Sequence, residues 1–104
     1  MQPTHFLYLA TPPRQTFVLD ATPAEYEILN RHFAYMQQLA DQGKLLLTGP
    51  TLDGKYGVAI LSVTTQEEAQ TLVDADPAVV AGLFQPNLHP LAVGIGPLSG
   101  AQKP

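Results

Sequence analysis

The chain contains no cysteine. This absence excludes disulfide bonds, metal sites built from thiolates and a cysteine nucleophile. No segment approaches the apolar length that spans a bilayer, and no positively charged stretch leads into an apolar one near the N-terminus. We therefore expect a cytoplasmic protein that has no membrane partner.

Charged residues are scarce as well. They make up 13% of the 104 residues, the formal net charge is -4, and 45% of the residues are hydrophobic. Without a basic stripe to neutralise phosphates, neither nucleic acid nor an anionic membrane surface is an expected partner. The phosphate loop, the Rossmann glycine pattern and the GxSxG elbow are missing too. The composition is that of a globular protein, and the length favours one domain over residues 1–104.

Hydrophobic patterning predicts an α+β protein with the element order βαββαβ. Strands are expected at 4–10, 44–48, 57–64 and 87–95, and helices at 23–42 and from 65 to about 76. Pro23 and Glu25 suit the first turn of a helix, and Gly43 suits its end. This order is typical of a ferredoxin-like fold, an antiparallel four-stranded sheet with both helices on one face.

Two segments fall outside this order. Residues 12–21 are interpreted as a loop insertion or a short extra strand, because their apolar run lies between prolines and a helix start. Residues 97–104 follow several glycines and are expected to form a loose tail.

The central strands are apolar on both faces. In the third strand Val58 and Ile60 point away from Ala59, and in the second we expect Leu45 and Leu47 to share a face. One face packs on the helices, and a second copy of the same sheet is the simplest cover for the other. This predicts a homodimer with its sheets face to face. A monomer with an apolar sheet surface is the alternative.

The first helix carries the main candidate for chemistry. Its apolar stripe is predicted to bury Leu29, Phe33 and Met36, and His32 lies at the edge of that stripe, facing the sheet. A partly buried imidazole can act as a general acid or base, or can be a core histidine bonded to a carbonyl. Asp76, which precedes a proline, could orient His32 or could simply cap a turn. Spacing alone leaves these alternatives open, because the two residues lie on different helices.

Weaker candidates lie on the strands. Tyr8 could supply a hydroxyl group to a cavity, although an aromatic residue in a strand is usually core. Gly49 and Pro50 leave one end of the sheet free of bulky side chains, so a ligand could approach the backbone there, or they could only form a turn. His5 and His89 lack the helical spacing of metal ligands, and we expect no metal site.

Three stretches in succession resemble the YciI-like, or YCII-related, family. They are RHFAYMQQL at 31–39, QGKLLLTGP at 42–50, and the run from Ala69 that ends in DADPAVVAGLF at 74–84. The resemblance covers roughly residues 4 to 95. It implies a ferredoxin-like fold dimerised into an α+β barrel, and an active-site histidine and aspartate that match His32 and Asp76.

The resemblance also implies a class of activity. The family is similar in fold to muconolactone isomerases, and one branch includes a dehydrochlorinase acting on a chlorinated hydroxyhydroquinone. This implies a cofactor-independent lyase or isomerase-like enzyme that uses His32 and Asp76 for acid-base chemistry on a small aromatic or lactone-like substrate. The alternative is a non-catalytic module that binds a small organic ligand or only dimerises. Residues 12–21 depart from the family pattern, being longer and richer in proline, and could reshape the mouth of a pocket.

Overall fold

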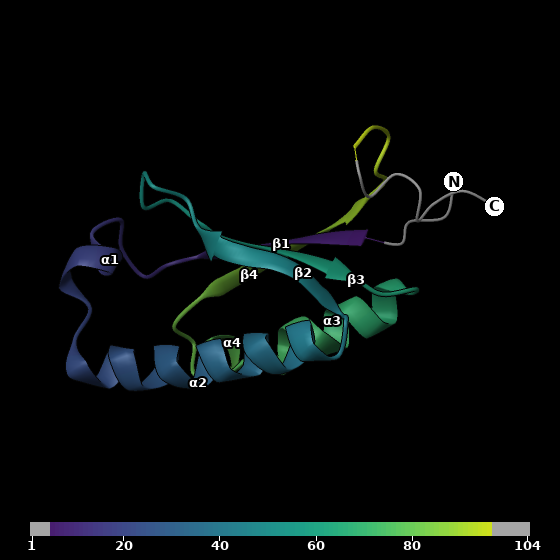
Figure 1. The fold of residues 1–104 in the computed structure, drawn as a ribbon. Coiled ribbons are helices and arrows are strands. Elements are labelled where there is room, and N and C mark those ends of the chain that lie inside the picture. The colour runs from purple at the N-terminus through teal and green to yellow at the C-terminus, as the bar shows by residue number, and fades with distance from the viewer. Residues whose placement is uncertain (1–4, 97–104) are drawn as a thin grey trace.

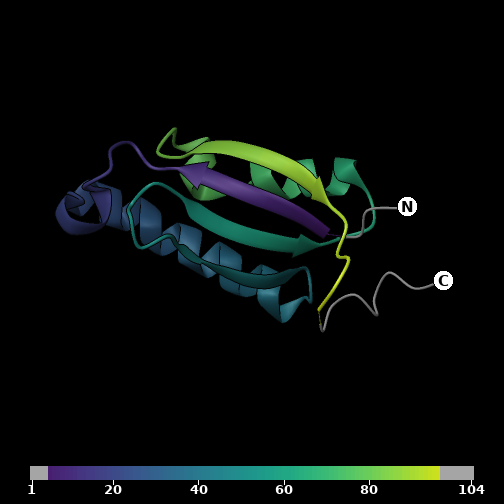
Figure 2. The same cartoon turned by 90° about the horizontal axis from the view of Figure 1, so that it is seen from above.

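The computed structural model describes residues 5–96 and has two layers, a sheet and the helices that cover one of its faces (Figure 1). The strands are β1 (His5–Thr11), β2 (Leu45–Pro50), β3 (Gly57–Ser62) and β4 (Gln85–Leu91). They form an antiparallel sheet in the order β2-β3-β1-β4, and Figure 2 shows them side by side from above. The predicted ferredoxin-like α+β fold is confirmed. The predicted tail, 97–104, lies outside the described residues.

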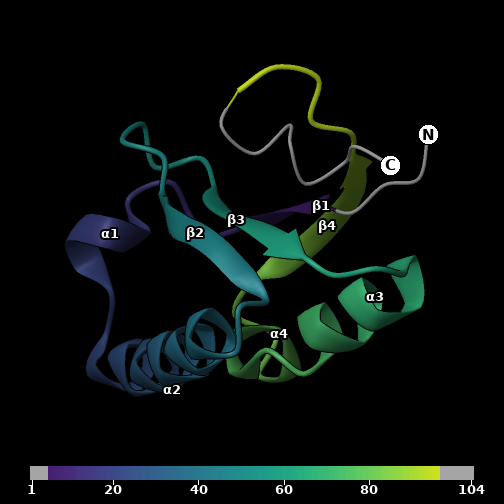
Figure 3. The ribbon, with the colours of Figure 1, turned by 45° about the vertical axis from the view of Figure 1, so that its right-hand side comes forward.

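The helices are α1 (Phe17–Asp20), α2 (Pro23–Asp41), α3 (Gln66–Asp74) and α4 (Pro77–Val80). A reciprocal capping box starts α2, because the Thr22 hydroxyl accepts from the Glu25 N–H while the Glu25 carboxylate accepts from the Thr22 N–H. Figure 3 shows α2, α3 and α4 below the sheet, with α4 packed beside α2. Among the described helices, none is long and apolar enough to cross a membrane.

Most boundaries differ from the sequence prediction by one or two residues, and two segments differ more. In the segment 12–21, residues 17–20 form a helical turn instead of a loop or strand, because the N–H groups of Leu19 and Asp20 both donate to the Thr16 carbonyl. The last strand, expected at 87–95, begins at Gln85 and ends at Leu91. It contains Pro86 and Pro90, which an edge strand tolerates because one side of its backbone needs no hydrogen-bonding partner.

The core lies between the sheet and the helices. Alternate residues of the two central strands are buried there, namely Phe6, Tyr8, Ala10, Ala59 and Leu61. The helices contribute Leu29, Met36, Leu39, Ala69 and Val73 to the same cluster. The other sheet face carries the intervening residues Leu7, Leu9, Val58 and Ile60, which are only half-buried.

Two predicted burial assignments are wrong. Leu45 is opposite Leu61, whereas Leu47 is opposite Ile60, so a β-bulge between them places their side chains on opposite faces of the sheet. Phe33 is 57% exposed, since the buried stripe of α2 passes through its neighbour His32 instead.

Candidate active site

His32 and Asp76 meet in the core, although they are 44 positions apart in sequence. The His32 Nδ1 atom lies 2.8 Å from Oδ1 and 2.9 Å from Oδ2 of Asp76. The imidazole is projected from the middle of α2, and the carboxylate comes from the residue that precedes α4. The exposed fraction is 7% for His32 and 0% for Asp76, so solvent barely reaches the contact.

The Asp76 carboxylate accepts two further hydrogen bonds. The Ala78 N–H donates to Oδ1 over 2.9 Å, which makes Asp76 the N-cap of α4, and the Tyr8 hydroxyl donates to Oδ2 over 2.8 Å. The capping role and the contact with His32 therefore coexist. An ionised carboxylate only accepts hydrogen bonds, so the hydrogen of the third contact belongs to His32 Nδ1. This leaves Nε2 as the imidazole nitrogen free to accept a proton from another molecule.

The charge of the carboxylate acts on two tyrosines, the buried Tyr8 and the partly buried Tyr35. Burial, and then the negative charge of Asp76, raise the pKa of Tyr8 far above its ordinary value. The same two causes, in the same order, raise the pKa of Tyr35, whose hydroxyl donates to the Leu72 carbonyl over 2.6 Å. Tyr8 therefore remains a neutral phenol that donates to Asp76, and it does not compete with His32 as a base.

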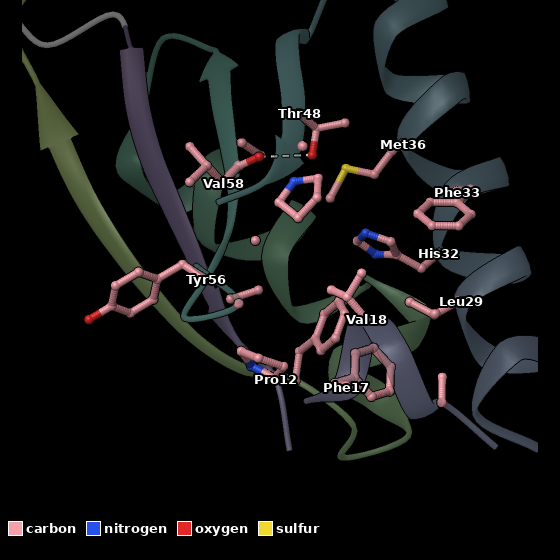
Figure 4. A pocket seen from close by; sticks show the side chains of 18 of the residues that line it. Pro12, Phe17, Val18, Leu29, His32, Phe33, Met36, Thr48, Tyr56 and Val58 are labelled. Carbon is pink, nitrogen blue, oxygen red and sulfur yellow. Dashed lines mark hydrogen bonds between the residues drawn. The ribbon is translucent and has the colours of Figure 1, made fainter. Parts of the chain in front are cut away.

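A pocket of about 460 Å³ opens in front of His32. Figure 4 shows the His32 ring extending into it from α2, with Thr48 on the sheet side. The described residues that line the pocket include no Asp, Glu, Lys or Arg. The Thr48 hydroxyl already donates to the Val58 carbonyl over 2.9 Å, and the Tyr56 hydroxyl points away from the imidazole in Figure 4. The imidazole is thus a polar group facing a mainly apolar cavity.

Aromatic rings fix the position of the imidazole. The Phe84 ring packs edge-on to His32, with centroids 5.3 Å apart and an interplanar angle of 82°. The Phe33 ring also contacts His32, with centroids 5.6 Å apart in a tilted arrangement. With Nδ1 bonded to Asp76 and the ring in contact with two phenylalanines, the orientation of Nε2 is defined before any ligand binds.

The segment 12–21 and the β2–β3 loop close one end of the pocket. Pro12, Phe17 and Val18 line it from the segment, and Gly54 lines it from the loop. Gly54 has φ of +77°, and a Cβ atom there would lie 2.5 Å from the Gln15 carbonyl oxygen. Both its backbone conformation and this close approach require glycine.

The other sequence candidates are distributed as follows. Tyr8, Gly49 and Pro50 all line the pocket, but the Tyr8 hydroxyl is directed to Asp76. Their role in binding a substrate, like the catalytic role of His32 and Asp76, stays a prediction. His5 is buried and His89 is exposed, and within residues 5–96 no three His, Asp or Glu side chains gather as potential metal ligands.

Sequence reasoning missed the contributions of Phe17, Phe84 and Arg14. Phe17 lies in the segment 12–21, which was left open between a loop and a short strand, and Phe84 ends the run 74–84, in which it was used only for the family resemblance. Arg14 binds both Asp20 and Glu25. An arginine followed within a dozen residues by two acids is a weak signal for such a clamp, because surface charges often have this spacing by chance.

Comparison with known proteins adds a family and a fold. The model of the YCII-related domain matches residues 5–87. A search of curated proteins found no match. Among solved structures, the chain is similar to 5-chloro-2-hydroxyhydroquinone dehydrochlorinase from Burkholderia phenoliruptrix AC1100 in complex with 2,5-dihydroxybenzoquinone. The TM-score is 0.67 and the identity is 22%, over 86% of this chain and 95% of that chain. At this identity the likeness is one of fold.

Proposed function

The chain belongs to the YCII-related family, and from this premise we propose that it is a cofactor-independent enzyme in which His32 is the general base and Asp76 orients it. The reaction is an elimination or an isomerisation of a small organic molecule. The observation that carries this proposal is the buried contact of His32 Nδ1 with Asp76 at 2.8 Å, which leaves Nε2 for the pocket.

The chemistry begins with proton transfer to His32 Nε2 from a carbon or oxygen of the substrate. The electron pair of the broken bond then forms a new π bond. In an elimination, a leaving group departs with its own electron pair, and His32 later releases the proton to solvent. In an isomerisation, His32 returns the proton to a different carbon. In both cases the Asp76 carboxylate stabilises the imidazolium that forms.

The lining of the pocket favours an uncharged substrate with a flat ring. A charged group in this apolar cavity would be desolvated without a partner, because the described lining includes no Asp, Glu, Lys or Arg. Aromatic faces and edges from Phe17, Phe33 and Phe84 suit a planar ring. The solved neighbour is described as a dehydrochlorinase in complex with a benzoquinone, which supports a small aromatic substrate; a neutral lactone fits the same lining.

A non-catalytic module that only holds a ligand is the second candidate, and the apolar lining favours it. The enzyme is better supported, since His32 lines the pocket and its Nδ1 is bonded to a buried Asp76 carboxylate that also accepts from Tyr8. The two candidates differ in what His32 should do. A ligand-binding module depends only on the volume of the His32 side chain, whereas the proposed enzyme depends on His32 Nε2 as a base.

Proton exchange in D₂O separates them. A panel of chlorinated hydroquinones, including 5-chloro-2-hydroxyhydroquinone, and of neutral lactones would be followed by NMR for deuterium uptake and by chloride release. We expect turnover of at least one compound by the wild type and a loss of about a hundredfold or more in His32→Gln. Equal rates for both proteins across the panel, with ligand binding retained, would establish the module.

A homodimer completes this proposal. The half-buried residues Leu7, Leu9, Val58 and Ile60 form an apolar surface on the sheet face opposite the helices. Packing against the same surface of a second copy would remove it from water. A cytoplasmic location and the lack of a nucleic-acid or membrane partner stay predictions from composition.

A further inference from the structure

Arg14 binds two helices at once. Its Nε donates to Asp20 Oδ1 over 2.8 Å and one Nη donates to the Asp20 carbonyl, at the end of α1. Its two Nη atoms also donate to the two carboxylate oxygens of Glu25, over 3.0 and 2.8 Å, in the first turn of α2. A paired arrangement of this kind fixes orientation as well as distance. Arg14 therefore holds α1 against the start of α2.

The same guanidinium covers a residue of the pocket. Its carbon lies 5.5 Å from the centroid of the Phe17 ring, within the range of a cation–π contact. Phe17 is 4% exposed and packs edge-on to Phe84, with centroids 6.0 Å apart. Phe84 in turn packs edge-on to His32. A continuous set of contacts thus leads from Arg14 through two rings to the imidazole.

We propose that residues 12–21 form a specificity wall, in which Phe17 sets the size of the ring that reaches His32 and Arg14 is the positioning residue that holds Phe17. This inference rests on the proposed function, since it concerns the substrate of that site. The buried Phe17 ring lines the end of the pocket that residues 12–21 close, so a substrate that extends from His32 towards this end meets the ring. The wall therefore selects single-ring substrates over fused two-ring ones.

The test is a comparison of two uncharged phenols, 4-methylphenol and 2-naphthol, bound to the full chain and measured by calorimetry. The measured quantity is the ratio of their affinities. In Phe17→Ala this ratio should shift towards 2-naphthol by about tenfold, the effect of removing bulk from an apolar pocket. In Arg14→Met it should shift in the same direction by a smaller factor, because Phe17 is present but less firmly held.

Leu19 provides the matched control. It belongs to the same helical turn as Phe17 but is 88% exposed and does not line the pocket. Leu19→Ala should leave the affinity ratio unchanged. If Phe17→Ala fails to fold, Phe17→Leu replaces it, because it changes the packing less. Its affinity ratio should lie between that of the wild type and the shift of about tenfold expected for Phe17→Ala. Equal changes in both affinities, or an unchanged ratio in Arg14→Met, would overturn the proposal.

A second readout needs no ligand. The chain has three histidines, so the Cε1–H signal of His32 can be assigned by NMR through its loss in His32→Gln. Because Phe17 packs on Phe84 and Phe84 on His32, this signal should move in Phe17→Leu and in Arg14→Met but not in Leu19→Ala. If neither phenol binds the wild type, the selection by ring size is refuted, and this signal then tests only whether the contacts from Arg14 through Phe17 and Phe84 reach His32 in solution. An unmoved signal in both variants would show that they do not.

Discussion

The Asp76 carboxylate accepts hydrogen bonds from His32 Nδ1 at 2.8 Å and from the Tyr8 hydroxyl at 2.8 Å, on its two different oxygens. His32 belongs to α2, Tyr8 to β1, and Asp76 caps α4, so one buried carboxylate joins three elements of the fold. Its contact with the imidazole is therefore a consequence of tertiary packing, and substitutions at Asp76 can separate its structural task from its chemical one.

Asp76→Asn is the sharpest such substitution. Asparagine is as good an N-cap as aspartate, so α4 should persist. It removes the negative charge that stabilises the imidazolium, and its amide can turn an N–H towards His32 Nδ1. Under the proposed mechanism, turnover should fall by about a hundredfold or more while the far-ultraviolet circular dichroism stays that of the wild type. Asp76→Ala, which also loses the cap, is the comparison; wild-type turnover in Asp76→Asn would contradict the role given to the charge.

Leu29 and Phe33 should differ in their contribution to stability, even though both lie on α2. Leu29 is 9% exposed, so Leu29→Ala should lower the free energy of unfolding by about 2 to 5 kcal/mol. Phe33 is 57% exposed and lines the pocket, so Phe33→Ala should cost less than about 1 kcal/mol and should mainly change ligand binding. Urea unfolding monitored by circular dichroism measures both values. A larger loss in Phe33→Ala would show that its ring is buried in solution.

The difference between Leu29 and Phe33 shows which features of α2 could be predicted from the sequence and which could not. Helical periodicity predicted α2 to within one residue of its bounds and turned His32 towards the sheet, since both follow from local spacing. It did not distinguish Phe33 from His32 as the more buried neighbour. The helix presents a broad apolar face, and its rotation against the sheet is decided by packing with other elements.

The same distinction holds at the site, where some contacts follow from local sequence and others depend on tertiary packing. That Asp76 caps α4 is a local property of an Asp-Pro sequence, and it was one of two open alternatives. That it also contacts His32 depends on α4 packing beside α2. The resemblance to a family paired these two residues, but the contacts of Phe17 with Phe84 and of Arg14 with Glu25 had no such guide.

Glu25 should stabilise the fold in a way that depends on pH. The Arg14 guanidinium, and next the Thr22 N–H, lower the pKa of Glu25 from 4.5 to about 2. A carboxyl group whose pKa is lower in the folded state contributes its full stability above the unfolded value, and loses it as the pH falls through the folded value. The difference in melting temperature between wild type and Glu25→Gln should thus be constant above pH 4.5 and shrink towards pH 2.

Glu27→Gln is the control for this measurement, because Glu27 is an exposed acid on the same helix. Glu27→Gln removes the same charge but leaves the contacts of Arg14 with Asp20 and Glu25 intact. The pH dependence of its melting temperature should therefore follow that of the wild type more closely than Glu25→Gln does. A difference between wild type and Glu25→Gln that stays constant down to pH 2 would show that Arg14 does not hold Glu25 in solution.

The sheet face opposite the helices should form the interface of a homodimer. Ile60 lies on this face in β3, beside Leu7 of β1, and is half-buried in the isolated chain. Burying such a surface against its copy is favourable by the hydrophobic effect, and a lysine at its centre would place a charge in the interface without an opposite partner. Light scattering on dilution to low micromolar concentration should show a dimer for the wild type and a monomer for Ile60→Lys.

Leu19→Lys is the control for this measurement. Leu19 is exposed on α1, away from this face, so the variant should remain a dimer. A wild type that is monomeric at every concentration would rule out the dimer, and a dimeric Ile60→Lys would move the interface to another surface.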